Sequence, residues 1–101
     1  MKQRIVIMTV QAVNDLVTMS DFITVKAGLK VADTYIERLK AFLRGFDLAS
    51  ERGTLRNDIR KGLRIIGFER RVTIAFNVTN TSVFILRIFW GGQNWQKLLE
   101  D

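Results

Sequence analysis

The spacing of hydrophobic residues changes near residue 9. Residues 3–8 are rich in β-branched side chains, which is typical of a short strand. From Ala12 onward the apolar residues recur every three or four positions, and this spacing predicts an amphipathic helix over about residues 10–23. Thr9 stands directly before that helix and is well suited to cap it. We therefore expect a strand that leads directly into a helix.

A second helical pattern follows a break at residues 24–28. Apolar residues resume at helical spacing, and charged residues occupy the opposite side of the same segment. This predicts a helix over residues 28–44, which Gly45 ends. Because the connection is short, the two helices are expected to lie antiparallel as a hairpin.

The second half of the chain has the spacing of strands. Residues 45–57 mix glycine, serine and charged residues, and we interpret them as a loop. Apolar and polar residues then alternate over residues 71–78, which predicts a strand with one buried face. We expect residues 59–67 to form another strand that pairs with it through a turn at residues 68–70.

The last strand is expected in the middle of the sheet. Residues 83–90 follow a cluster of turn-forming residues and are apolar except for Arg87, which indicates burial on both faces. Gly91 and Gly92 end this strand, and residues 94–100 could form a short final helix. The order β-α-α-β-β-β predicts an α+β fold, with a helical hairpin packed on a mostly antiparallel sheet. Nothing in the 101 residues suggests a second domain.

Three missing residue types exclude several kinds of chemistry. The chain has no histidine, no cysteine and no proline. It therefore has no disulfide, no thiolate nucleophile, no cysteine-ligated metal and no serine–histidine–aspartate triad. We expect neither a cofactor nor a metal site. The short apolar run near the start is interpreted as a strand and not as a targeting signal, and no segment reaches the ~18 apolar residues of a membrane span. We therefore expect a cytoplasmic protein without membrane contacts.

The positive charge is concentrated in one stretch. The net charge is +6, and residues 52–71 hold seven cations against two acids. This stretch is either a solvated surface or a binding patch for nucleic acid or an acidic protein. The seven cations are Arg52, Arg56, Arg60, Lys61, Arg64, Arg70 and Arg71.

Arg87 is unusual because it interrupts an apolar strand. A guanidinium there needs a partner or an open site. One interpretation is an ion pair with Asp15 or Asp58, and the other is an anion site beside Arg64.

The aromatic residues near these cations also allow two interpretations. Trp90 and Trp95 either close the core or act as exposed anchors for a partner. Tyr35 lies on the apolar side of the second helix and is interpreted as core, not as a catalytic group. No catalytic motif is present.

An ordered series of short motifs resembles a known superfamily. The chain is similar to the RelE/ParE toxins of bacterial toxin–antitoxin modules, and most of all to the ParE branch, whose members are also called plasmid-stabilisation proteins. The similarity extends over nearly the whole chain and makes residues 1–101 one ParE-like domain. The motifs are Thr9-x-x-Ala12-x-x-Asp15-Leu16, Gly53-x-x-Arg56-x-Asp58-Ile59-x-x-Gly62-Leu63-Arg64, Arg71-Val72-Thr73-Ile74-Ala75-Phe76-Asn77-Val78 and Val83-x-Ile85-Leu86-Arg87-Ile88-x-x-Gly91.

The resemblance implies partners and a choice between two activities. A cognate antitoxin, encoded alongside, would wrap around the chain. Without the antitoxin, the chain itself is not expected to bind specific DNA sequences. RelE-like members cut messenger RNA on the ribosome with basic residues and a C-terminal tyrosine, whereas ParE-like members inhibit DNA gyrase. Here Gly91, Gly92 and Gln93 follow the last strand, and the single tyrosine lies in a helix. We therefore favour a non-catalytic gyrase inhibitor. A ribosome-dependent endoribonuclease and a non-toxic, antitoxin-binding member remain alternatives.

The resemblance and the charge pattern together select the candidate contact residues. The candidates for target binding are Arg56, Arg60, Arg64, Arg87, Trp90 and Trp95. The candidates for antitoxin binding are Arg52, Arg56, Arg64, Arg70 and Arg71.

Overall fold

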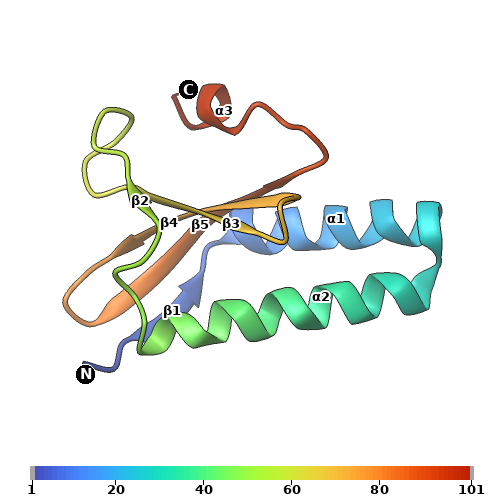
Figure 1. Ribbon diagram of the computed structural model, residues 1–101, viewed down its shortest axis with the longest axis horizontal. Coiled ribbons are helices and arrows are strands. Elements are labelled where there is room, and N and C mark those ends of the chain that lie inside the picture. The colour runs from blue at the N-terminus through green and yellow to red at the C-terminus, as the bar shows by residue number, and fades with distance from the viewer. Residues whose placement is uncertain (1, 101) are drawn as a thin grey trace.

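A computed structural model describes residues 2–100 as a helical hairpin packed on one face of a five-stranded sheet (Figure 1). A short third helix lies on the other side of the sheet (Figure 1). None of the helices in this part of the chain has the length and apolar content needed to cross a bilayer. In chain order the elements are β1 (Ile5–Met8), α1 (Val10–Ala27), α2 (Leu29–Arg44), a 3-10 turn (Gly45–Asp47), β2 (Thr54–Leu55), β3 (Arg64–Phe68), β4 (Val72–Val78), β5 (Ser82–Trp90) and α3 (Trp95–Glu100).

The sheet has the order β1-β5-β4-β3-β2. Strand β1 runs parallel to β5, and every other neighbouring pair is antiparallel. A parallel pair needs a long crossover connection, and the helical hairpin begins that connection after β1. The predicted α+β architecture is therefore confirmed. Strand β5 lies inside the sheet, between β1 and β4, although the middle position belongs to β4.

The first helix is longer than the sequence predicted. It extends to Ala27 instead of ending near residue 23, because Thr24 continues the helix and its hydroxyl donates to the carbonyl of Ser20 at 2.8 Å. The turn between the helices is then Gly28 alone, with a φ of +97° that suits glycine. The predicted N-cap is confirmed, since the Thr9 hydroxyl accepts a hydrogen bond from the amide of Ala12. Gly45 ends the second helix, as predicted.

The prediction of a strand over residues 59–67 was wrong for its first half. Strand β3 begins only at Arg64, and the residues before it form turns. The side chain of Asn57 accepts a hydrogen bond from the amide of Gly62 at 2.8 Å, and this contact closes the turn. The predicted loop over residues 45–57 also contains β2 and the 3-10 turn. The short final helix is confirmed as α3.

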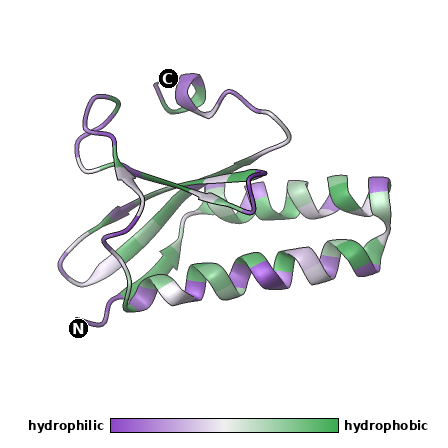
Figure 2. Ribbon diagram, viewed as in Figure 1, coloured by the Kyte–Doolittle hydropathy of each residue, from purple (hydrophilic) through white to green (hydrophobic). Residues whose placement is uncertain are grey.

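Apolar side chains gather on both faces of the sheet. The main core fills the space between the hairpin and the sheet, with the large buried side chains Met19, Leu39, Phe46 and Phe76 at its centre. A smaller second core lies on the opposite face beneath α3. The hydropathy colouring shows that the strands between the two cores are largely apolar (Figure 2). Its buried members are Leu63, Ala75, Phe89 and Leu99.

The edge of β5 is completed by α1. Strand β1 pairs with β5 only as far as the Met8–Ile85 pair, which leaves the rest of that edge without a strand neighbour. The carboxylate of Asp15 accepts a hydrogen bond from the backbone amide of Ile88 at 2.8 Å. It also accepts two hydrogen bonds from the guanidinium of Arg87, at 2.8 and 3.0 Å. These hydrogen bonds raise the pKa of the Arg87 guanidinium above its ordinary value. Of the two interpretations of Arg87, the structure supports the ion pair, and its partner is Asp15.

We predict that Asp15→Ala lowers the free energy of unfolding by about 2 to 4 kcal/mol. The variant leaves a half-buried guanidinium without its counter-ion and the amide of Ile88 without an acceptor. Urea unfolding followed by circular dichroism measures the loss. Asp21→Ala, on the exposed side of the same helix, is the control and should change stability by less than about 0.5 kcal/mol. Equally small losses in both variants would contradict this role of Asp15.

Candidate functional site

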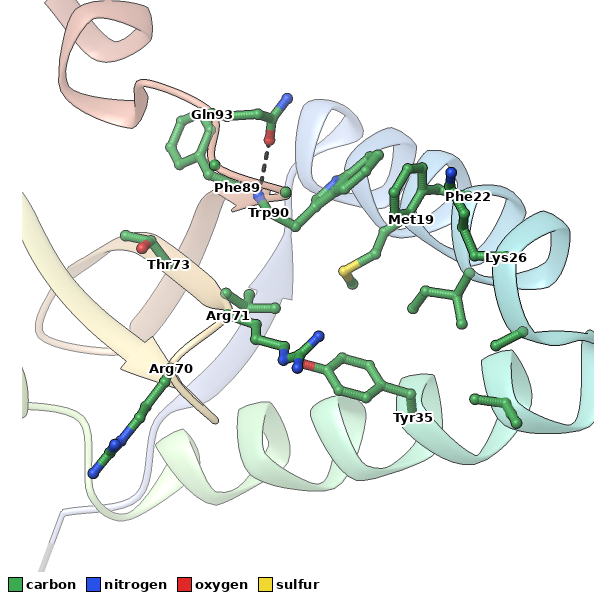
Figure 3. Close-up of a pocket in the computed structure, with 16 residues that line it drawn as sticks. Met19, Phe22, Lys26, Tyr35, Arg70, Arg71, Thr73, Phe89, Trp90 and Gln93 are labelled. Carbon is green, nitrogen blue, oxygen red and sulfur yellow. Dashed lines mark hydrogen bonds between the residues drawn. The ribbon is translucent and has the colours of Figure 1, made fainter.

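A groove of about 630 Å³ lies between the helical hairpin and the end of the sheet where β5 stops (Figure 3). Its walls are mainly apolar and come from both helices and from β5. The cations around it come from α1 and from the turn between β3 and β4. The residues that define this groove in the text are Met19, Phe22, Ile23, Lys26, Val31, Tyr35, Arg70, Arg71 and Trp90.

An aromatic pair forms one wall of the groove. The rings of Phe22 and Trp90 lie 4.9 Å apart, centre to centre, at an angle of 44°. The amide of Trp90 donates to the side chain of Gln93 at 2.8 Å, which holds the chain in place just after β5 (Figure 3). Phe22 remains 44% exposed, although it is a large apolar side chain. Partly exposed aromatic rings of this kind are common anchors in protein interfaces.

The turn between β3 and β4 brings two arginines to the groove. Glu69 and Arg70 have φ values of +49° and +61°, which are costly for residues other than glycine. Arg38 on α2 donates two hydrogen bonds to the Glu69 carboxylate, at 3.0 and 2.9 Å. These bonds hold the pKa of Glu69 below its ordinary value and tie the turn to the helix. The turn is thereby fixed with Arg71 beside the groove (Figure 3).

Tyr35 carries a buried hydroxyl without a hydrogen-bond partner. Its ring meets Phe68 edge to face and lies under the guanidinium of Arg38. Burial, followed by the charge of Glu69, raises the pKa of the phenol above its ordinary value, so the hydroxyl keeps its proton at neutral pH. A buried polar group without a hydrogen bond lowers the stability of a protein by about 1 to 3 kcal/mol. A ligand that accepts a hydrogen bond from this hydroxyl would remove that penalty.

The predicted contact residues are divided among four places, one of which is the ion pair of Arg87 with Asp15 at the edge of β5. Arg70, Arg71 and Trp90 line the groove. On the side of α3, Arg56 forms two hydrogen bonds with Asp58 and stacks over Trp95 at 5.5 Å. The neighbouring Arg60 donates to the carbonyl of Leu99. The helix is thus held by arginines, and Trp95 packs against the second core rather than standing free.

Arg52 and Arg64 form the third group, near the end of α2. The guanidinium of Arg52 lies 4.8 Å from the centres of the Phe42 and Phe46 rings, and Arg64 donates to the carbonyl of Arg52. Arg64 pairs with Phe76, whereas Arg87 pairs with Ala75. Since side chains alternate between faces along a strand, the two arginines lie on opposite faces of the sheet. The predicted alternative of an anion site shared by Arg87 and Arg64 is therefore wrong.

The groove cannot be predicted from the spacing of apolar residues. Phe22 and Tyr35 follow helical spacing on the apolar sides of their helices, and spacing alone does not distinguish the centre of a core from its margin. A usable signal was the composition of α1, whose exposed side also carries apolar residues such as Val10, Val17 and Val25. A helix that is apolar on most sides is normally covered.

Comparisons with known proteins agree with the fold. A family described as "ParE toxin of type II toxin-antitoxin system, parDE" matches residues 6–95. A solved structure described as "Chromosomal ParDE TA system from P. aeruginosa" superimposes with a TM-score of 0.76 at 21% sequence identity. The match covers 87% of this chain and 96% of the other. No curated protein sequence gives a significant match.

The strained turn yields a test by glycine substitution. We predict that Arg70→Gly raises the free energy of unfolding by about 1 kcal/mol, because glycine adopts positive φ without steric cost. Arg71→Gly removes the same charge from a position without positive φ, and it should lower stability by about 0.5 to 1 kcal/mol. Thermal and urea unfolding of both variants measure the difference. A loss of stability in both would show that the turn is not strained at residue 70.

Proposed function

This chain belongs to the ParE toxins of type II toxin–antitoxin systems, and we propose that it inhibits DNA gyrase by binding it and is neutralised by a cognate antitoxin that docks in the groove. The observation that carries the antitoxin site is the groove's combination of apolar walls with cations and no acidic lining residue. Both proposed partners act in the cytoplasm, which is where we place the activity.

The chemistry of the groove favours a protein partner. Phe22 and Trp90 offer apolar contact area, and Lys26, Arg70 and Arg71 offer positive charge around it. Aromatic residues and arginine are enriched among the residues that dominate protein interfaces. The structural neighbour comes from a ParDE toxin–antitoxin system, which supports a partner of this kind. We therefore propose an antitoxin segment with both acidic and apolar side chains.

The arrangement of the arginines supports inhibition by binding rather than RNA cleavage. Cleavage needs a group that activates the 2′-hydroxyl, together with cations that stabilise charge at the same phosphate. Arg64 and Arg87 lie on opposite faces of the sheet, and Arg87 is already neutralised by Asp15. For contact with gyrase we propose the separate surface formed by Arg60 and Lys61 beside α3, where both cations are exposed.

Supercoiling by purified gyrase tests the proposed target. We expect the chain to abolish supercoiling of relaxed plasmid while cellular transcripts stay intact. Arg60→Gln should weaken inhibition by about tenfold, the effect expected for loss of one charged interface contact. Arg44→Gln, the same change at an exposed position on α2, is the control and should inhibit like the wild type. Unchanged supercoiling at a large molar excess would refute the gyrase proposal, and transcript cleavage would favour the ribonuclease alternative.

Calorimetric titration with the antitoxin encoded beside this chain tests the groove. Phe22→Ala should weaken binding by about 30-fold, as expected for an aromatic anchor. Val25→Ala is the control, because Val25 is 84% exposed on the same helix and does not line the groove. Affinity should also fall as salt is added, because added ions screen exposed charges. Equal binding by both variants, or an affinity independent of salt, would contradict this site.

A further inference from the structure

We propose that Tyr35 and Arg71 form a carboxylate-binding subsite in the groove, which receives an aspartate or glutamate side chain of the antitoxin. The inference rests on the proposed function in one respect, namely that the groove is where the antitoxin docks. It goes beyond that function by naming the chemical group, a carboxylate, that Tyr35 and Arg71 bind. The arrangement of the two side chains is visible in Figure 3.

Two hydrogen-bond donors meet here without an acceptor. Within residues 2–100 the Tyr35 hydroxyl has no hydrogen-bond partner, and the charge of Arg71, drawn beside it in Figure 3, acts on the phenol. A protonated phenol and a guanidinium both donate to an oxygen anion. A carboxylate has two oxygens and can accept one hydrogen bond from the phenol and one from the guanidinium. It thereby gives the hydroxyl a hydrogen-bond partner and the guanidinium a counter-ion.

Residues 2–100 do not supply this carboxylate. Glu69 is the acid whose charge acts on the Tyr35 phenol, but both of its oxygens are held by Arg38 at 3.0 and 2.9 Å. Among residues 2–100, no aspartate or glutamate lines the groove. We therefore assign the acceptor to a partner.

The apolar walls around the two donors indicate which kind of molecule carries the carboxylate. Phe22, Trp90 and the buried Met19 form apolar walls beside the two donors. A nucleic acid would place charged phosphates and a solvated backbone against these walls, which is unfavourable. A peptide that carries an apolar side chain near its acidic one can satisfy the walls and the donors at once. We therefore assign the subsite to a protein carboxylate.

The exposure of Arg71 gives a carboxylate access to the subsite. The Tyr35 hydroxyl is covered, whereas Arg71 is an exposed side chain with several rotatable bonds. A small movement of its guanidinium admits a carboxylate between the two donors. Arg70, the next residue, points away from Tyr35 (Figure 3). Arg44 on α2 carries the same charge, is exposed and does not line the groove, and it therefore provides the matched control.

A small probe tests the subsite without any antitoxin. We would titrate the full chain, labelled with ¹⁵N, with 4-phenylbutyrate and with its neutral analogue 4-phenylbutanol, and follow the amide signals of groove residues. The acid should bind about tenfold more tightly than the alcohol, as expected for charge-assisted hydrogen bonds. Tyr35→Phe and Arg71→Gln should each remove most of this preference, and Arg44→Gln, outside the groove, should retain it. Both conservative variants are first checked for native amide spectra.

Equal binding of acid and alcohol, or an unchanged preference in Tyr35→Phe, would overturn the subsite. Displacement of 4-phenylbutyrate by a single-stranded DNA oligonucleotide, with loss of the same signals, would overturn the assignment to a protein carboxylate. In a second arm, Tyr35→Phe should weaken antitoxin binding by about tenfold, and full affinity would also overturn the proposal. If the wild type selects the acid but does not bind the antitoxin, the proposed function fails while the carboxylate subsite stands.

Discussion

The open edge of β5 is the constraint on which the rest of this structure depends. Beyond Ile85 that strand has no neighbour on the β1 side, and unpaired backbone groups at a sheet edge need partners. Thr9 and Asp15 supply them from α1, since the threonine hydroxyl donates to the carbonyls of Ile85 and Leu86 and the carboxylate accepts from Ile88. The first helix is therefore held against the sheet by polar contacts as well as by the main core.

The position of α1 in turn creates the groove. The hairpin reaches beyond the end of the sheet, so its far part has no strand beneath it (Figure 1). Apolar residues in that part, such as Phe22 and Val31, are consequently left half-covered or exposed. The apolar side of the hairpin continues past the core, but the sheet is too short to cover all of it. A surface suited to a partner follows from the unequal lengths of the two layers.

The sequence was sufficient to predict most elements but not how distant side chains meet. Helical spacing located α2 to within one residue. The interruption of an apolar strand singled out Arg87 but left an ion pair and an anion site open, and the structure shows the ion pair with Asp15, one of the two candidate partners. The division of the basic stretch into three places depends on strand register and on the turn before β3, which spacing does not encode. The unpartnered hydroxyl of Tyr35 depends on which side chains surround it, and those come from α1 and the turn after β3.

The attachment of α3 has a consequence for the dynamics of the chain. This helix has six residues and follows Gly91 and Gly92, two glycines with positive φ that have open space around them. It covers a core of only a few side chains, so little apolar area is exposed when it opens. Opening of α3 should therefore cost much less than global unfolding. In hydrogen exchange, the amides of α3 should therefore form a separate unit that opens early, whereas those of β4 and β5 should exchange only with the whole domain.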